Sequence, residues 1–363
     1  MNEITFDELG PAKVIHLYSP RIPLRAVVVV DNIALGPAIG GVRVSPTVTA
    51  EEVMRLARTM TLKNSIAGLP HGGAKAGIIA DPKRVEPERL FRGFARMIRD
   101  LVEYIPGPDM GSNETAMAWI MDVTGRSCGL PEEIGGLPLD RLGATGFGLA
   151  SCAAVAAPRA GFDLRGARVA IQGFGSVGKA VALFLQEKGA IVIAASDTGG
   201  TIHQPDGIDA HELAHVKKAG GSVTSFPRGR RLGSDDIFGL DCDILIPAAT
   251  PDVINEENAG DIRARLVLQG ANIAVTAGAE AVLARRGILS VPDFIANAGG
   301  VIMAAMEYAG KSAEEAFTAI DGRIAKNTTL ILDKAAAEGI LPRPAAMAIA
   351  RERVLRAMEY REV

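Results

Sequence analysis

The chain has 363 residues, of which 48% are hydrophobic, 22% charged and only 4% aromatic. The length predicts two domains, and the hydrophobic content excludes a wholly disordered protein. The formal net charge of −3 excludes the basic surface with which proteins bind nucleic acids. The longest aliphatic block, Ala26 to Val30, is far too short to span a membrane. We therefore expect a cytoplasmic protein without nucleic-acid or membrane partners.

The beginning of the chain predicts strands followed by a helix. Residues 15–30 are rich in β-branched residues and predict extended chain, which the segment Gly36 to Gly41 breaks. Thr49 and Glu52 have the spacing of a capping box, and apolar residues follow them at helical intervals. Gly68-Leu69-Pro70 ends this pattern, so we expect one helix between these two signals.

Two lysines and one aspartate in this half are candidate catalytic residues. Lys63 falls near the C-terminal end of the predicted helix, and Lys75 falls in a glycine-rich segment, 72–77, that predicts a loop. After a predicted helix over 87–102, the proline-containing stretch 106–109 holds Asp109 rigidly. If the three side chains meet, one ammonium group lowers the pKa of the other, and Asp109 moves protons. Their spacing leaves open the alternative that each is a surface charge.

Beyond about residue 140 the sequence predicts strands that alternate with helices. The glycine- and proline-rich region 129–138 predicts the linker that precedes them. Each predicted strand is a short continuous apolar run, which is typical of a parallel sheet covered on both faces. The predicted strands are 168–172, 191–195, 243–247, 266–269 and 288–291. Long amphipathic helices are expected over 313–337 and 344–360.

A glycine fingerprint in this half predicts a dinucleotide site. The motif Gly173-Phe174-Gly175-Ser176-Val177-Gly178 follows a predicted strand and opens a predicted helix, which is the context that the fingerprint requires. The first glycine permits a tight turn, the second lets a pyrophosphate approach the backbone, and the third lets helix and strand pack closely. A purely structural glycine-rich turn is the alternative. Asp197, at the end of the next predicted strand, either accepts hydrogen bonds from the ribose of NAD or caps its own turn.

The three cysteines give no sign of a disulfide framework or a metal site. Cys128, Cys152 and Cys242 are widely spaced and form no CxxC pair. We expect them to be core or surface thiols, and we expect no bound metal.

Several further motifs stand in a fixed order along the chain. They are Gly40-Gly41-Val42-Arg43, the run from Lys63 to Gly77, the run from Pro108 to Glu114, the run from Ala144 to Gly148, the glycine fingerprint, the run from Gln269 to Asn272, and the run from Ala296 to Val301. Together they resemble the glutamate/leucine/phenylalanine/valine dehydrogenase family over nearly the whole chain. The run from Lys63 to Gly77 resembles the signature of that family most specifically.

The resemblance implies a fold and a reaction. The implied fold is a two-domain α/β protein, with an α/β substrate-binding and oligomerisation domain at 1–138 and a doubly wound Rossmann-type NAD(P)-binding domain at 139–337. The C-terminal helix, about 338–363, is expected to pack back onto the first domain. The implied reaction is the reversible oxidative deamination of an L-amino acid to a 2-oxo acid and ammonium, with hydride transfer to NAD, or to NADP. The protein would be a homo-oligomer with small-molecule partners.

The resemblance also implies roles for individual residues. Lys63 would bind the substrate α-carboxylate, and Lys75 would activate water and polarise the carbonyl. Asp109 would exchange protons with the intermediates. Besides the glycine fingerprint and Asp197, the implied cofactor-binding residues are Thr145, Ala248, Asn272 and Asn297.

The side-chain pocket predicts an apolar substrate of the Leu, Val, Ile or Phe type. Ile39, just before Gly40, stands where glutamate-specific family members have Lys, and Ala304 stands where they have Ser. An unpaired glutamate carboxylate would be costly to bury there. Gly107 and Val301 complete the expected pocket, and Gly107 leaves room for an aromatic ring. A glutamate dehydrogenase with a rearranged pocket and a catalytically silent dinucleotide-binding sensor remain the alternatives.

Overall fold

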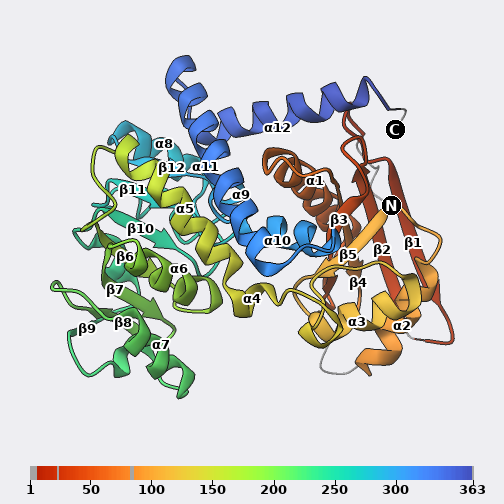
Figure 1. Ribbon diagram of the computed structural model, residues 1–363, viewed down its shortest axis with the longest axis horizontal. Coiled ribbons are helices and arrows are strands. Elements are labelled where there is room, and N and C mark those ends of the chain that lie inside the picture. The colour runs from red at the N-terminus through yellow and green to blue at the C-terminus, as the bar shows by residue number, and fades with distance from the viewer. Residues whose placement is uncertain (1–5, 23, 82–85, 362–363) are drawn as a thin grey trace. The chain divides into compact units, whose positions relative to one another are not determined.

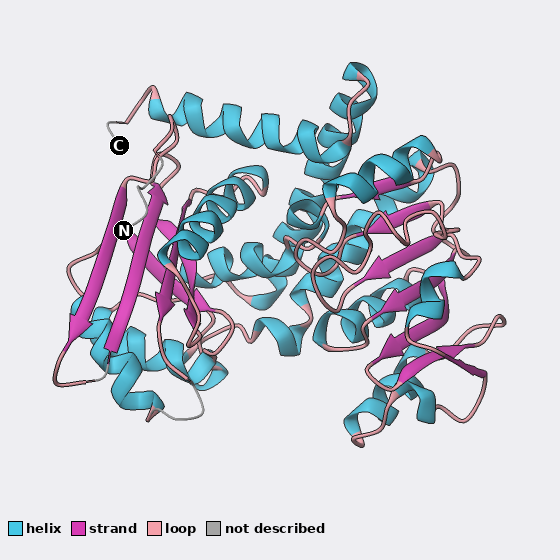
Figure 2. Cartoon of the chain, turned by 180° about the vertical axis from the view of Figure 1, so that it is seen from behind, coloured by secondary structure: helices cyan, strands magenta, loops and turns pink. Residues whose placement is uncertain are grey.

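The computed structural model describes residues 6–22, 24–81 and 86–361 (Figure 1). The chain forms two compact units, each with its own sheet (Figure 2). Unit 1 comprises residues 1–139, 301–316 and 347–363, and unit 2 comprises residues 140–300 and 317–346.

Unit 1 contains a five-stranded mixed sheet with strand order β1-β2-β4-β3-β5. The strands are β1 (Lys13–Ser19), β2 (Leu24–Asn32), β3 (Ala38–Val44), β4 (Gly72–Ile78) and β5 (Tyr104–Pro108). Strands β1, β2 and β4 pair antiparallel, whereas β3 pairs parallel with both β4 and β5. The extended segment predicted at 15–30 is therefore an antiparallel pair of strands, β1 and β2, rather than one strand.

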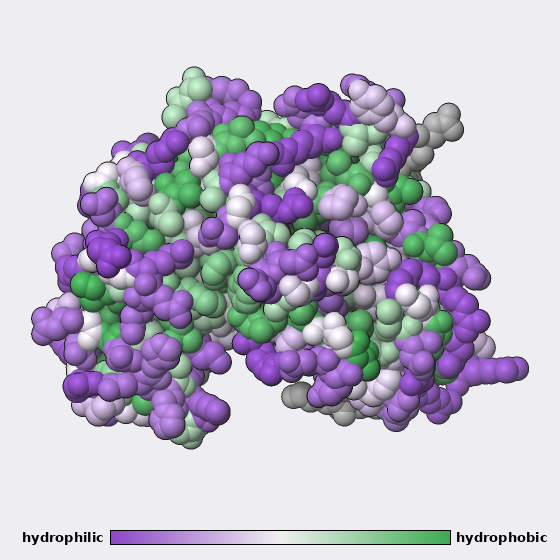
Figure 3. All heavy atoms as spheres, viewed as in Figure 1, coloured by the Kyte–Doolittle hydropathy of each residue, from purple (hydrophilic) through white to green (hydrophobic). Residues whose placement is uncertain are grey.

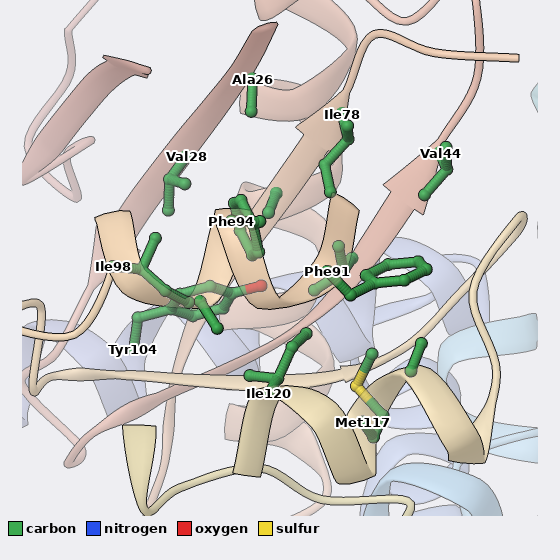
Figure 4. Close-up of a cluster of buried hydrophobic side chains, with 14 of the residues drawn as sticks. Ala26, Val28, Val44, Ile78, Phe91, Phe94, Ile98, Tyr104, Met117 and Ile120 are labelled. Carbon is green, nitrogen blue, oxygen red and sulfur yellow. The ribbon is translucent and has the colours of Figure 1, made fainter. Parts of the chain in front are cut away.

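Helices cover both faces of this sheet. The helices are α1 (Ala50–Ile66), α2 (Pro87–Met97) and α3 (Glu114–Thr124). Val27 and Val29 of β2 join a cluster with residues of α1, while Val28 and Val30 join the cluster that contains α2 and α3. Figure 4 shows the second cluster, in which Phe94 lies between the helices and the sheet. Because alternate residues of β2 point to opposite faces, burial on both faces explains its unbroken run of valines.

Two glycine-rich segments of unit 1 are strands, and the sequence-based predictions for them are wrong. The break expected at Gly36 to Gly41 is largely β3, and the loop expected at 72–77 is β4. Packing explains the glycines. A Cβ atom added at Gly40 would lie 1.7 Å from the carbonyl oxygen of Ala74, and one added at Gly73 would lie 2.0 Å from the backbone nitrogen of Thr61 in α1. Glycine allows these backbones to approach closely, so here it marks tight packing rather than a loop.

The helix predicted over 87–102 ends early, at Met97. Arg126 explains this end, because its guanidinium donates to the carbonyl oxygens of Ile98, Arg99 and Leu101. The turn after α2 is thus held by a side chain distant in sequence, and no local signal predicts it.

Unit 2 contains a seven-stranded sheet with strand order β12-β11-β10-β6-β7-β8-β9. The strands are β6 (Arg168–Gln172), β7 (Ile191–Asp197), β8 (Gly200–His203), β9 (Arg230–Leu232), β10 (Ile244–Pro247), β11 (Leu266–Leu268) and β12 (Leu289–Val291). The first five strands in this order pair parallel, and the doubly wound arrangement expected from the sequence is confirmed. β8 and β9 add an antiparallel edge that the sequence analysis missed.

The helices of the second half of the chain belong partly to unit 2 and partly to unit 1. They are α4 (Leu139–Leu142), α5 (Ala144–Arg159), α6 (Ser176–Glu187), α7 (Ala210–Lys218), α8 (Ala277–Arg285), α9 (Asp293–Ala296), α10 (Gly299–Tyr308), α11 (Ala313–Glu338) and α12 (Pro342–Met358). In Figure 1, α5 and α6 lie side by side against one face of the sheet. Residues 347–358 of α12 belong to unit 1, where the hydroxyl of Ser65 donates to the carbonyl oxygen of Ala350.

The described residues include no helix that is both long and apolar enough to cross a membrane. Hydrophilic residues predominate on the face that Figure 3 shows, with hydrophobic residues scattered among them.

Candidate functional site

Lys75 and Asp109 form an ion pair in unit 1. Lys75 lies in the middle of β4, and Asp109 follows the last residue of β5. The amine of Lys75 lies 2.9 Å from Oδ2 of Asp109. Arg43, on the intervening strand β3, donates from Nε to the same oxygen at 3.0 Å and from Nη1 to Glu52 at 2.6 Å. Three neighbouring strands therefore bring the predicted catalytic pair together, although Lys75 lies on a strand rather than in a loop.

Gly41 leaves the space in which this pair meets. A Cβ atom added at Gly41 would lie 2.7 Å from Cβ of Asp109 and 3.0 Å from the Lys75 amine. The Asp109 backbone is held in turn, because its N–H donates to the hydroxyl of Ser112. This hydroxyl itself donates to the carbonyl oxygen of Val42 on β3. Ser112 therefore fixes the backbone at Asp109, and Gly41 leaves room for the Lys75 amine.

Burial and charge shift the pKa of both groups. Lys75 is only 6% exposed, and burial lowers its pKa below the usual lysine value, against the opposing effect of the Asp109 carboxylate. Burial acts to raise the pKa of Asp109, but the charges of Lys75 and Arg43 outweigh it, and the pKa of Asp109 is lowered. The site therefore combines an ionised carboxylate with an amine that deprotonates more easily than an exposed lysine. This combination suits general acid–base chemistry.

Lys63 is buried in the last turn of α1. This helix packs along β4, the strand of Lys75. The amide of Asn64 donates to the carbonyl oxygen of Gly72 at 2.7 Å and so fixes the end of α1 against the start of β4. The role of Lys63 in binding the substrate α-carboxylate stays a prediction from the resemblance.

The residues expected to line the substrate side chain lie on two strands, β3 and β5, and on helix α10. Ile39 is buried on β3, and Gly107 on β5 lies opposite Gly41 in the register of the two strands. Val301 and Ala304 lie on α10, where Ala304 is buried. A Cβ atom added at Gly107 would lie 3.1 Å from Sγ of Cys128.

Cys128 and Arg43 have positions that sequence analysis did not foresee. The thiol of Cys128 occupies the space behind Gly107, and burial raises its pKa. Arg43 is the cation nearest in sequence to Ile39, but it is bound by Asp109 and Glu52. The family-like motif that contains Arg43 was visible in the sequence, whereas the position of Cys128 depends on the pairing of distant segments.

The glycine fingerprint in unit 2 has the geometry of a dinucleotide cradle. Gly173 has φ +90° and follows the last residue of β6, and a Cβ atom added at Gly178 would lie 1.9 Å from the carbonyl oxygen of Gly173. Gly175 has no atom within 4 Å of the position that a Cβ atom would take. Helix α6 begins at Ser176, and no side chain caps its N-terminus. Open space in front of uncapped N–H groups fits a pyrophosphate, so these residues fit NAD or NADP.

The other predicted cofactor residues gather at the carboxyl ends of the parallel strands, where doubly wound folds bind their ligands. Ala248 follows β10, and a Cβ atom added at Gly270 would lie 3.1 Å from its Cβ. The amide of Asn297 donates to Oδ1 of Asn272 at 2.9 Å. The hydroxyl of Thr145, in the first turn of α5, lies 3.1 Å from the position of an added Cβ atom at Gly300.

The carboxylate of Asp197 is already engaged within unit 2. Oδ1 accepts from the backbone N–H of Gly199 and from the hydroxyl of Ser222. Oδ2 accepts from the amine of Lys217 at 2.6 Å and from the N–H of Val223. The structure thus contains the turn-capping interaction that the sequence allowed, and it places a lysine beside the carboxylate. Within the described residues, no group of three or more His, Cys, Asp or Glu side chains is arranged to hold a metal ion.

Three similar proteins are named as glutamate dehydrogenases. NADP-specific glutamate dehydrogenase of Saccharolobus shibatae is 41% identical over 355 residues, which cover 91% of this chain and 83% of that protein. Glutamate dehydrogenase of Thermotoga maritima is 44% identical over 293 residues, which cover 76% of this chain and 70% of that protein. The crystal structure of hetero-hexameric glutamate dehydrogenase from Thermus thermophilus in its Leu-bound form has a TM-score of 0.85 at 34% identity, and covers 97% of this chain and 90% of that one.

Two family models match the chain. The model described as the Glu/Leu/Phe/Val dehydrogenase dimerisation domain matches residues 22–126. The model described as Glutamate/Leucine/Phenylalanine/Valine dehydrogenase matches residues 135–362. Together with the ion pair of Lys75 and Asp109 and the dinucleotide cradle, these matches show that the chain belongs to the glutamate/leucine/phenylalanine/valine dehydrogenase family of amino-acid dehydrogenases.

Proposed function

We propose that the protein catalyses the reversible oxidative deamination of L-glutamate to 2-oxoglutarate and ammonium with NAD or NADP. The observation that carries this proposal is the buried ion pair of Lys75 and Asp109 in a chain whose relatives from Saccharolobus shibatae and Thermotoga maritima are named glutamate dehydrogenases. The choice of glutamate follows the alternative in the sequence analysis, because these relatives support it better than the apolar substrate expected first.

In the proposed mechanism, Lys63 holds the α-carboxylate of the substrate. NAD(P), which the glycine fingerprint Gly173–Gly178 would hold, would supply the hydride acceptor for oxidation of the substrate to its protonated imine. Lys75, as the neutral amine, takes a proton from the water that attacks this imine. Asp109 then receives this proton from the Lys75 ammonium, 2.9 Å away, and passes it to the amino group of the carbinolamine. As the C–N bond breaks, the hydroxyl proton returns to Lys75, so that the 2-oxo acid and ammonia form, and ammonia takes up a proton to become ammonium. The lowered pKa of Lys75 favours the neutral amine that this step needs.

An apolar L-amino acid is the second candidate substrate. Ile39 and Ala304 are both buried and apolar, and neither offers a charge or a hydrogen-bond donor to a side-chain carboxylate. Arg43, the nearest cation in sequence, is already bound by two carboxylates. The apolar preference predicted from these residues is not confirmed by the relatives, and it stays a prediction.

The experiment that tests both candidates is the initial rate of cofactor reduction with Glu, Leu, Val, Phe and Trp, each with NAD and with NADP. Turnover of Glu above the others supports the proposal. Turnover of the apolar substrates without Glu overturns it in favour of the second candidate. Cofactor binding without turnover of any substrate favours the catalytically silent sensor.

Substitution of Ile39 by lysine tests the position of the side-chain pocket. We expect Ile39→Lys to raise the ratio of kcat/KM for Glu to kcat/KM for Leu by about tenfold or more, because a new ammonium group would pair with the side-chain carboxylate. Ile39→Met, which keeps an apolar side chain, is the matched control and should leave the ratio nearly unchanged. An unchanged ratio in a folded Ile39→Lys protein would place the pocket elsewhere.

Substitution of Arg43 tests the electrostatics of the ion pair. The charge of Arg43 lowers the pKa of Lys75, so its removal raises that pKa. Because deamination needs the neutral amine, we expect the rising limb of kcat/KM against pH to move to higher pH in Arg43→Gln. Arg55, exposed on α1, provides the control Arg55→Gln, for which the profile should not move. A profile that moves to lower pH would contradict the role of Lys75 as the base.

The proposal includes an oligomeric protein. The family model that matches residues 22–126 is described as a dimerisation domain, and the similar Thermus thermophilus protein is hetero-hexameric. A homo-oligomer is therefore proposed here, and sedimentation velocity of the purified chain tests it.

A further inference from the structure

We infer that Asp293 is a positioning residue that holds the cofactor-binding turn around Asn272 in a strained conformation, with Arg343 holding Asp293 in turn. This inference rests on the proposed use of NAD(P). The residues concerned all belong to unit 2, within 140–300 or 317–346.

The strain lies at Ile273, the residue after Asn272. Ile273 has φ +53°, in the left-handed region that β-branched residues rarely adopt. Its side chain is 53% exposed, so packing of the side chain does not explain the conformation. Its carbonyl oxygen accepts from the N–H of Asp252 at 2.8 Å, and its own N–H donates to Oδ2 of Asp293 at 3.0 Å. Hydrogen bonds to the backbone therefore hold this turn.

Asp293 is itself fixed by a buried ionic network. It is only 4% exposed, and its Oδ1 lies 3.0 Å from Nη1 of Arg343, as an ion pair without a hydrogen bond. The other edges of the Arg343 guanidinium donate to Glu280, at 2.9 and 3.0 Å, and to the side-chain oxygen of Gln269, at 2.9 Å. Gln269 in turn donates to Glu280 at 2.7 Å. Hydrogen bonds to Glu280 and Gln269 therefore fix the guanidinium, whose charge then holds the Asp293 carboxylate next to it.

Asn297, four residues after Asp293, also binds the turn around Asn272. Asn297, immediately after α9, donates from Nδ2 to Oδ1 of Asn272 and to the carbonyl oxygen of Gly270. Asp293 is the first residue of α9. Residues at the two ends of α9 therefore bind residues 270–273: Asp293 accepts from Ile273, and Asn297 donates to Gly270 and Asn272. These bonds set the direction of the Asn272 side chain. Proteins commonly hold ligand-contacting groups in place by such supporting hydrogen bonds.

The test combines loss and rescue, with the dissociation constants of NADH and NADPH measured by nucleotide fluorescence. Asp293→Asn replaces one acceptor by a donor that faces either Arg343 or the N–H of Ile273. We expect about tenfold weaker binding in this variant, because a displaced contact residue commonly costs an order of magnitude or more. Ile273→Gly removes the backbone strain, so the double variant should recover at least half of the lost binding on a logarithmic scale.

The matched control is Asp243→Asn. Asp243 also accepts from a backbone N–H, that of Arg168 at 2.8 Å, and lies 3.6 Å from Arg265. It precedes β10, whereas the cofactor residues follow the parallel strands, so this variant should bind both nucleotides like the unmodified protein. If Asp293→Asn fails to fold, Arg343→Lys keeps the charge but loses the planar contacts, and it should weaken binding by about threefold.

The outcomes separate this inference from the proposed function. Binding within twofold of the unmodified protein in folded Asp293→Asn or Arg343→Lys would overturn the inference alone, as would the absence of rescue by Ile273→Gly. An unmodified protein that binds neither NADH nor NADPH would overturn the proposed cofactor, and the inference with it.

Discussion

Replacement of Lys75 by alanine is expected to lower kcat for amino-acid oxidation by about 10³-fold or more, with the dissociation constant of the cofactor unchanged within about twofold. The amine of Lys75 contacts Asp109 in unit 1, whereas the glycine fingerprint lies in unit 2. Its loss therefore removes the proposed proton acceptor without altering the glycine fingerprint. Steady-state kinetics and nucleotide fluorescence titration of the same preparation measure the two quantities.

Lys75→Arg is the companion variant for this prediction. Arginine keeps a positive charge beside Asp109 but does not deprotonate near neutral pH. It should therefore be almost as inactive as Lys75→Ala. Substantial activity in Lys75→Arg would mean that the site needs a charge rather than a base. Loss of cofactor binding in Lys75→Ala would indicate that Lys75 maintains the fold.

The second large effect is expected on stability, from Arg126. Its guanidinium donates to five backbone carbonyl oxygens, which belong to Ile98, Arg99, Leu101, Tyr104 and Thr124. Arg126→Met keeps much of the side-chain volume but removes all five hydrogen bonds, although the oxygens of Ile98 and Leu101 keep the backbone N–H donors of Leu101 and Tyr104. Each buried unpaired acceptor costs about 1–3 kcal/mol, so we expect the free energy of unfolding to fall by about 3–5 kcal/mol.

Denaturant unfolding at one fixed protein concentration measures this loss, since subunit association would otherwise change the apparent stability. Arg92→Met is the control. Arg92 pairs with Glu88 and Asp122 on the surface, and exposed ion pairs contribute little. Equal effects of the two substitutions would show that the hydrogen bonds of Arg126 do not stabilise the turn after α2.

The pair of Lys75 and Asp109 shows which contacts sequence motifs can predict. Lys75 and Asp109 were predicted from a family-like run and a proline-containing stretch, and the structure joins them at 2.9 Å. The participation of Arg43 and Glu52 was not predicted, because it depends on the register of β3 between β4 and β5. The glycines of 72–77 led to the wrong prediction of a loop where the structure has strand β4. Local propensity treats a glycine as a loop former, whereas here glycines make room for α1 and for the Lys75 amine.

For the substrate, individual residues and overall similarity lead to different predictions. Two residues, Ile39 and Ala304, led to the prediction of an apolar amino acid, while similarity over most of the chain favours glutamate. Framework motifs such as the cradle and the lysine signature occur whatever the side chain of the substrate. Recognition of that side chain depends on a few groups, and tertiary packing sets their positions.

The sequence by itself determined the two-domain α/β fold, the five parallel strands of unit 2, the glycine fingerprint and the family. These features follow from hydrophobic periodicity and from motifs of neighbouring residues, which a chain carries independently of its folded form. Only the tertiary structure decided that 72–78 is a strand, that Arg126 ends α2, and that Asp293 holds the turn at Ile273. Each of these depends on groups far apart in sequence, and their hydrogen bonds and close contacts exist only once packing has brought the segments together.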